Sequence, residues 1–80
     1  MTAPLESEAA VGDRLLHVSP RETQVLEMTS QGLTNDEIAK RLNVTTHAVK
    51  FHLASIYRKL GVANRTEAAV LYLRSTGLSS

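Results

Sequence analysis

Residues 34–60, TNDEIAKRLNVTTHAVKFHLASIYRKL, contain two helix start signals separated by a very short interval. Thr34 and Glu37 have the spacing of a capping box, in which each side chain accepts a hydrogen bond from the other residue's backbone N–H. Asn43 tolerates the left-handed conformation that ends a helix, and Thr45 is an N-cap residue for the next one. Because two helices joined by a link of about three residues cross at a large angle, the pattern predicts a helix-turn-helix.

The sequence before this pair predicts one more helix. Ser19, Pro20 and Glu22 form a second capping box, with proline at the first helical position. Gly32 suits the left-handed residue that follows a helix, so we expect this helix to end near Gln31.

The sequence after the pair predicts a fourth helix, over about residues 64–76. Asn64 is its N-cap, Glu67 stands at the third helical position, and Gly77 lies just beyond its end. The chain has neither an alternating apolar run nor an Asn-Gly turn that would indicate strands. The predicted fold class is therefore all-α, with four helices in one domain over residues 18–80.

Residues 1–17 have a different character, because they show no apolar period before Leu15 and Leu16. We expect a mobile, flexible N-terminal tail, with these two leucines anchoring its end. Neither a signal peptide nor an apolar run of about 20 residues is present, so we expect no membrane contact and a cytoplasmic location.

The predicted recognition helix, about residues 45–60, has two unlike faces when it is wound at about 100° per residue. One narrow stripe is apolar and predicts the core face: Val49, Leu53, Ile56 and Leu60. The opposite face carries a cation, hydrogen-bonding groups and one aromatic: His47, Phe51, Ala54, Ser55 and Arg58. Lys50 lies at one edge of this face and Lys59 at the other. A helix of this kind fits the major groove of DNA.

Composition narrows the function classes. The 80 residues hold 9 basic and 8 acidic side chains, yet residues 38–66 contain no acid, which indicates a surface that faces a polyanion. A chain of this size has little room for a deep pocket, and its isolated glycines form no phosphate-cradling loop, so we expect no enzyme. No cysteine is present, and His47 and His52 lack the spacing of a helical metal pair. We therefore expect neither a metal nor a cofactor.

Three side chains of the predicted recognition helix are candidates for reading bases: His47, Lys50 and Phe51. Lys50 suits either a phosphate or the O6 and N7 atoms of guanine. Phe51 points away from the core stripe, so it either contacts a thymine methyl group or a sugar of the DNA or packs against the N-terminal tail.

A larger set of polar and basic side chains forms the candidates for phosphate contacts: Thr34, Asn35, Thr46, His52, Arg58, Lys59 and Arg65. Thr34 and Asn35 belong to this set because a helix N-terminus attracts anions. His52 has an open alternative, since it lies at the edge of the core stripe and could be a packing residue.

The predicted helix over 64–76 carries two apolar stripes. Ala68, Leu71 and Tyr72 form the stripe that closes the core, and the second stripe consists of Ala69, Val70 and Leu73. A single small domain has nothing left to cover the second stripe, so we expect it to form a two-fold dimer.

The chain resembles the LuxR-type (GerE-like) DNA-binding domain of bacterial transcription regulators over residues 18–78. Several blocks carry the resemblance, in this order: VSPRE at 18–22, GLTNDEIA at 32–39, VKFHL at 49–53, IYRKLGV at 56–62 and NRTEA at 64–68. It implies a third helix in the major groove, a fourth helix in a dimer, and base contacts at Lys50 and Phe51. In the family this domain usually follows a sensing domain, so residues 1–80 are either a stand-alone regulator or an excised effector domain.

The function predicted from these observations is sequence-specific binding of double-stranded DNA by a homodimeric bacterial transcription regulator. The alternative is a helix-turn-helix module that binds a protein, such as a subunit of RNA polymerase or another regulator. No small-molecule site is expected in this domain.

Overall fold

The computed structural model describes residues 14–76, which contain the four α-helices α2 (Pro20–Ser30), α3 (Asn35–Leu42), α4 (Thr46–Leu60) and α5 (Arg65–Thr76). No strand occurs in this range, so the all-α prediction is confirmed. The helix-turn-helix is α3 followed by α4. The predictions for residues 1–13 and for Gly77 lie outside the described residues.

The helices begin where the capping signals predicted. At α2 the Glu22 N–H donates to the Ser19 hydroxyl at 3.1 Å, and the Ser19 N–H donates to the Glu22 carboxylate at 2.9 Å. The same reciprocal pair joins Thr34 and Glu37 at α3, at 3.2 and 2.8 Å. At α4 the Thr45 hydroxyl accepts a hydrogen bond from the Ala48 N–H at 3.0 Å. Each bond satisfies a backbone donor that the first helical turn leaves without an intrahelical partner.

Three left-handed residues end the first three of these helices or follow them directly. Asn43 has φ 57° after α3, Gly61 has φ 69° after α4, and Gly32 has φ 92° one residue past the C-cap of α2. Asparagine is one of the few non-glycine residues that adopt this conformation at low cost. It therefore allows the chain to reverse within the short link to α4.

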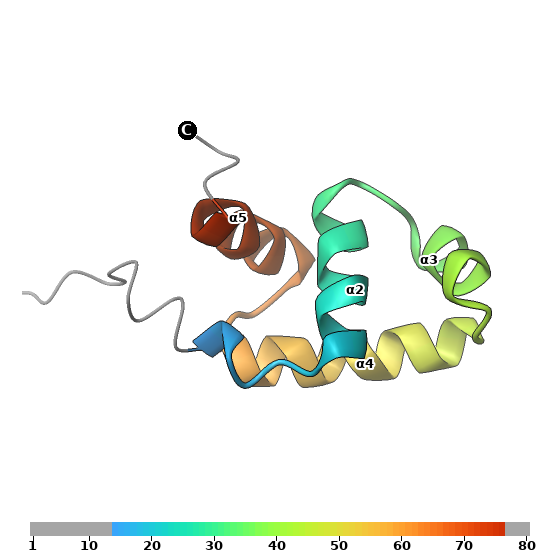
Figure 1. Cartoon of the computed structure of the whole chain (residues 1–80), viewed down its shortest axis with the longest axis horizontal. Coiled ribbons are helices and arrows are strands. Elements are labelled where there is room, and N and C mark those ends of the chain that lie inside the picture. The colour runs from blue at the N-terminus through green and yellow to red at the C-terminus, as the bar shows by residue number, and fades with distance from the viewer. Residues whose placement is uncertain (1–13, 77–80) are drawn as a thin grey trace, which may run out of the picture.

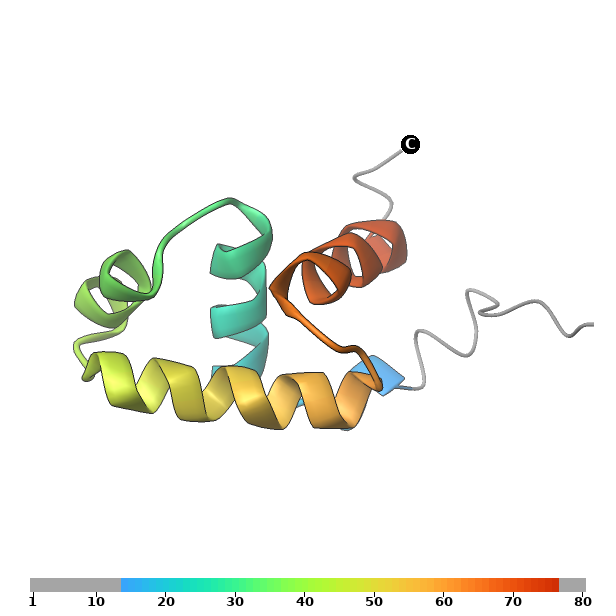
Figure 2. The same cartoon turned by 180° about the vertical axis from the view of Figure 1, so that it is seen from behind.

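The long α4 lies along one side of the other three helices, and α2 stands between α3 and α5 (Figures 1 and 2). Helices α3 and α5 both pack on α2 and on α4, but they do not pack on each other. The opposite side of α4 is left uncovered by these helices.

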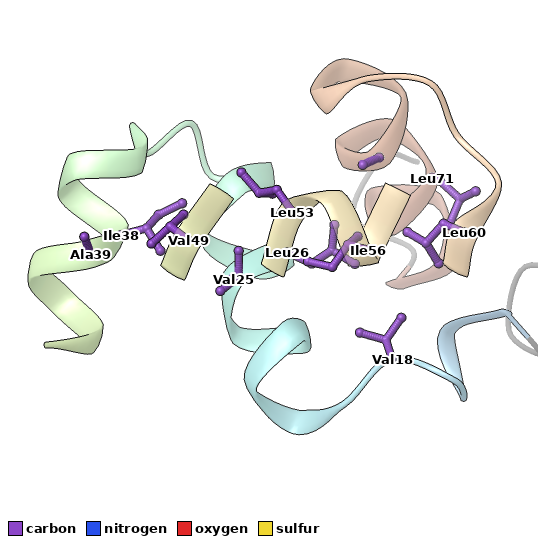
Figure 3. Packing of buried hydrophobic residues seen from close by; sticks show 11 residues of the cluster. Val18, Val25, Leu26, Ile38, Ala39, Val49, Leu53, Ile56, Leu60 and Leu71 are labelled. Carbon is purple, nitrogen blue, oxygen red and sulfur yellow. The ribbon is translucent and has the colours of Figure 1, made fainter. Parts of the chain in front are cut away.

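Every helix contributes to one hydrophobic core (Figure 3). The buried residues are Val18, Val25, Leu26, Ile38, Ala39, Val49, Leu53, Ile56, Leu60, Ala68 and Leu71. Four of them, Val49, Leu53, Ile56 and Leu60, are the stripe predicted for α4. They lie on the side of α4 that the other helices cover.

A short turn before α2 already contacts the helical body. The Arg14 guanidinium donates to the carbonyl oxygen of Leu60 at 2.9 Å, and Leu15 packs against the core. A cation at the C-terminal end of α4 also interacts favourably with the helix dipole, whose negative end lies there. Leu16, in contrast, is 82% exposed, so the prediction that it anchors the tail is wrong. Adjacent side chains in the turn point in different directions, and only Leu15 is directed at the core, where it is partly buried.

Candidate nucleic-acid interface

The uncovered side of α4 carries one continuous row of exposed side chains, which we call the outer face: His47, Lys50, Phe51, Ala54 and Arg58. The spacing of three and four residues places them on one side of the helix. Phe51 is 72% exposed, and its ring meets the His52 ring edge-on, with centroids 6.2 Å apart. Within residues 14–76, neither Lys50 nor Arg58 has a hydrogen-bond or ion-pair partner, so both cations are available to a ligand.

Ser55 does not belong to this face. It was predicted to lie opposite the core, but only 8% of it is exposed. It lies about 80° around the helix axis from His47, on the side where α2 packs against α4. The Ser55 hydroxyl helps to lower the pKa of the Glu22 carboxyl.

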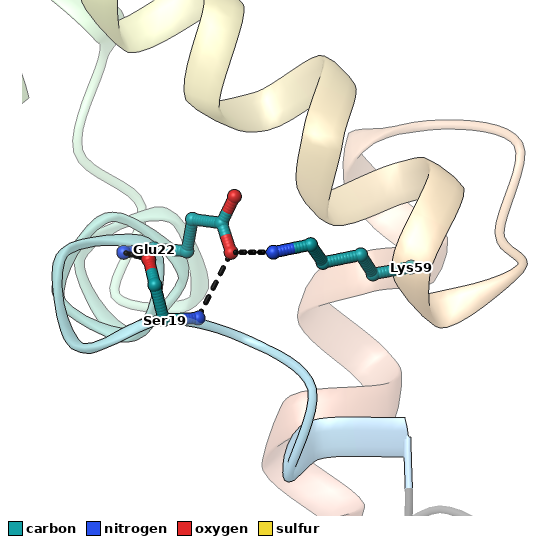
Figure 4. A network of polar contacts seen from close by, with 3 residues as sticks. All are labelled: Ser19, Glu22 and Lys59. Carbon is teal, nitrogen blue, oxygen red and sulfur yellow. Dashed lines mark hydrogen bonds and ion pairs between the residues drawn. The ribbon is translucent and has the colours of Figure 1, made fainter.

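Glu22 is the centre of a polar network that joins α2 to α4 (Figure 4). One carboxylate oxygen accepts hydrogen bonds from the Ser19 N–H at 2.9 Å and from the Lys59 ammonium at 2.7 Å. Burial by itself raises the pKa of the Glu22 carboxyl. The hydrogen bonds from Lys59 and Ser19, together with the effect of the Ser55 hydroxyl, outweigh burial and lower that pKa to about 2. The carboxylate is therefore ionised at neutral pH and holds Lys59 at the flank of α4.

The start of α3 brings three predicted phosphate contacts together. The Thr34 N–H donates to the Glu37 carboxylate, and this hydrogen bond holds the Glu37 pKa below its ordinary value. The Thr46 hydroxyl, at the first residue of α4, donates to an Asp36 carboxylate oxygen at 3.0 Å. Asn35 is half-buried and accepts a hydrogen bond through its side-chain oxygen. These side chains are thus fixed by contacts within the protein.

An open pocket lies beside this cluster, in the angle between α3 and α4. It is lined by Asp36, Ala39, Lys40, Asn43, Val44, Thr45 and Thr46. Ala39 is 5% exposed, and its small side chain allows the two helices to approach. No three His, Cys, Asp or Glu side chains gather into a metal site anywhere in residues 14–76.

Arg65 is not oriented as a free cation. Its guanidinium is partly buried and donates to the Asn35 side-chain oxygen at 2.8 Å and to the carbonyl oxygen of Leu33. Among the basic side chains predicted to contact phosphate, Arg65 and Lys59 are the two that the described residues show hydrogen-bonded within the protein. No local pattern indicates these long-range pairs, because their partners are 37 and 30 residues away along the chain.

The two stripes of α5 are separated as predicted. Ala68 and Leu71 are buried in the core, and Tyr72 packs against it. On the other side, Val70 is 45% exposed, and Ala69 and Leu73 are half-buried. An apolar strip thus remains open along α5. None of the described helices combines the length and apolar character that crossing a membrane requires.

Comparison with known proteins gives one consistent result. Residues 17–72 match the family model GerE, described as "Bacterial regulatory proteins, luxR family". The nitrate/nitrite response regulator protein NarL of Escherichia coli (strain K12) is 37% identical over 71 residues, which are 88% of this chain and 33% of that protein. The nitrate/nitrite response regulator protein NarP of the same strain is 40% identical over 60 residues, or 75% of this chain and 28% of that protein. The transcriptional regulatory protein ComA of Bacillus subtilis (strain 168) is 41% identical over 61 residues, or 76% and 28%. The chain therefore spans no more than 33% of the length of these relatives.

Proposed function

Because the chain belongs to the luxR family of bacterial regulatory proteins, we propose that it binds double-stranded DNA sequence-specifically as the effector domain of a transcription regulator. Helix-turn-helix domains of this type bind DNA and are not a class of enzyme. The observation that supports binding through α4 is the outer face, where unpaired cations and one exposed aromatic share a helix whose other side is buried in the core. A helix with this division fits the major groove.

The outer face supplies the proposed base contacts. Lys50 donates to guanine O6 and N7, Phe51 contacts a thymine methyl group, and His47 reaches a third base edge. The proposed phosphate contacts fix the position of the protein along the DNA without reading its base sequence. They are Thr34, Asn35, Thr46, His52 and Arg58. Lys59 already neutralises Glu22, so we expect it to contribute less to phosphate binding than the unpaired Arg58 does.

A homodimer through α5 is the proposed assembly, and Ala69, Val70 and Leu73 are its proposed interface. A two-fold pair of domains presents two recognition helices to two related half-sites. The apolar strip on α5 supports this proposal, because Val70 is 45% exposed in the single chain. The cytoplasm is the proposed location, since that is where bacterial DNA is reached.

Selection of bound duplexes from a randomised pool at moderate salt tests the proposal. We expect an enriched motif with two related halves. Lys50→Ala should weaken binding to the selected duplex by about 1–3 kcal/mol, whereas Arg74→Ala, which removes a charge from the last turn of α5, should not reduce specificity.

The alternative gives different outcomes. A module that binds a polymerase subunit or another regulator would enrich no motif, and its affinity would change little with salt. DNA binding requires a log–log salt slope of several units, since each phosphate contact contributes about −0.9.

A further inference from the structure

Arg65 connects two parts of the fold that do not pack on each other. It is the first residue of α5, while its two hydrogen-bond acceptors, the Asn35 side chain and the Leu33 carbonyl, lie at the entry to α3. Helices α3 and α5 lie on opposite sides of α2 (Figure 1), and their backbones do not approach each other. The guanidinium therefore spans the gap, and its half-buried position shows that it is held there.

The chemistry of the contact fixes the direction of the Asn35 amide. A guanidinium carries five N–H donors and no acceptor, so only the amide oxygen can face it. The amide NH2 group must then point the other way. Two separate acceptors, one side chain and one backbone carbonyl, also require the planar fork of arginine. The single ammonium of lysine does not reproduce this geometry.

We propose that Arg65 is a positioning residue for DNA binding and that it acts through Asn35 and Leu33, not as a phosphate contact of its own. The proposal rests on the proposed function. Arg65 fixes the entry to α3 against α5 and turns the Asn35 NH2 group outward, where it donates to the DNA backbone. Binding then depends on the shape of the Arg65 side chain and not on its charge.

Conservative and non-conservative variants separate shape from charge. The probe is the duplex enriched in the selection above, with affinity measured by fluorescence anisotropy over a range of salt concentrations. We expect Arg65→Lys and Arg65→Gln to weaken binding alike, by about five- to tenfold, with the salt slope unchanged. If Arg65→Lys keeps full affinity while Arg65→Gln lowers the slope by about 0.9, Arg65 is a direct phosphate contact and the proposal is wrong.

A double-mutant cycle with Asn35 tests the path of the effect. If Arg65 acts through Asn35, the double variant Arg65→Gln, Asn35→Ala binds within about twofold of Asn35→Ala alone, since coupled residues are not additive. Additive losses would overturn the proposal. So would a wild-type affinity for Asn35→Ala, which leaves the arginine in place and keeps the Thr34 cap.

The free protein provides a readout that does not depend on DNA. The side-chain amide resonances of Asn35 should shift in Arg65→Lys, which keeps the positive charge. They should stay in place in the matched control Arg58→Gln, which removes an exposed, unpaired cation from the outer face. Unchanged Asn35 resonances in Arg65→Lys would show that the contact does not orient the amide.

Failure of this inference and failure of the proposed function are distinguishable. If the wild-type chain binds no duplex, the proposed function is wrong and the inference is wrong with it. If the wild type binds and Arg65→Lys binds equally well, only the role of Arg65 is wrong.

Discussion

The Lys59 ammonium lies 2.7 Å from the Glu22 carboxylate, and the pair joins the first turn of α2 to the last turn of α4. The Glu22 side chain is only 7% exposed, whereas that of Lys59 is 35% exposed. The carboxylate is thus the buried partner, and the ion pair with the ammonium replaces part of its lost contact with water. Removing one member of a buried ion pair leaves the other charge buried without a partner. The loss of stability is then larger than the net stability that the intact pair contributes.

The free energy of unfolding should decrease as the pH is lowered, and Glu22 should account for part of that decrease. Its pKa is about 2 in the folded protein and 4.5 for the unperturbed group. A lowered pKa contributes stability that is present above pH 4.5 and is lost as pH falls towards 2. The contribution is about 3 kcal/mol, because each pKa unit corresponds to about 1.4 kcal/mol.

Urea unfolding of the wild type and of Glu22→Gln between pH 7 and pH 2.5 measures this contribution. The difference between the two proteins should be largest at pH 7 and should shrink below pH 4.5. Glu27→Gln, an exposed substitution on the same helix, is the control and should change stability by less than about 0.5 kcal/mol. A difference that stays constant over this pH range would contradict the assignment.

The Thr29 hydroxyl predicts a stabilising substitution. The residue lies in α2 and is 4% exposed, and its hydroxyl has no hydrogen-bond partner within the described residues. A buried hydroxyl without a partner is unfavourable by about 1–2 kcal/mol. Thr29→Val should therefore raise the thermal midpoint. Thr23→Val, exposed on the same helix, controls for helix propensity; an equal rise in both variants would rule out the hydroxyl as the cause.

Phe51 and Leu53 should have opposite effects although they are two residues apart on α4. Phe51→Ala removes a side chain that is 72% exposed, so it should leave stability within about 0.5 kcal/mol but weaken binding to the selected duplex by about 1 kcal/mol. Leu53→Ala removes a buried side chain and should destabilise the fold by about 2–5 kcal/mol. Denaturant unfolding combined with anisotropy separates the two. Loss of stability in Phe51→Ala would show that the ring packs on the protein.

Val70 tests the proposed dimer. Val70→Asp introduces a charge at a position that is 45% exposed, so the single domain should fold normally while association through α5 is lost. Sedimentation should show a smaller species, with unchanged circular dichroism. The control is Thr66→Asp, an exposed change in the first turn of the same helix. An unchanged sedimentation coefficient in Val70→Asp would remove α5 from the interface.

The helices were predictable from sequence because their boundaries depend on local chemistry. Ser19, Thr34 and Thr45 each bond to a backbone N–H three residues away, so the signal and the structure lie in the same few residues. Apolar spacing likewise predicted which side of α4 is buried. Periodicity failed at Ser55, because a residue near the border of two faces is buried or exposed according to what packs beside it.

The partners of the cations were not predictable. The sequence predicts Lys59 and Arg65 as phosphate contacts because their charge and their helical positions are visible in it. Their bonds to Glu22 and Asn35 depend on how α2 and α5 pack, and sequence spacing carries no information about those distances. Local patterns therefore predict more free cations than the structure contains, because packing pairs Lys59 with Glu22 and Arg65 with Asn35.

The division of α4 into a buried stripe and an outer face separates two properties that often conflict in proteins. The residues that hold the fold and the residues proposed to contact DNA alternate along one helix but share no side chain. Exposed positions such as 47, 50, 51 and 54 can change at little cost in folding free energy. A domain built in this way can acquire a new target by substitution at a few surface positions, while its scaffold and its stability are inherited intact.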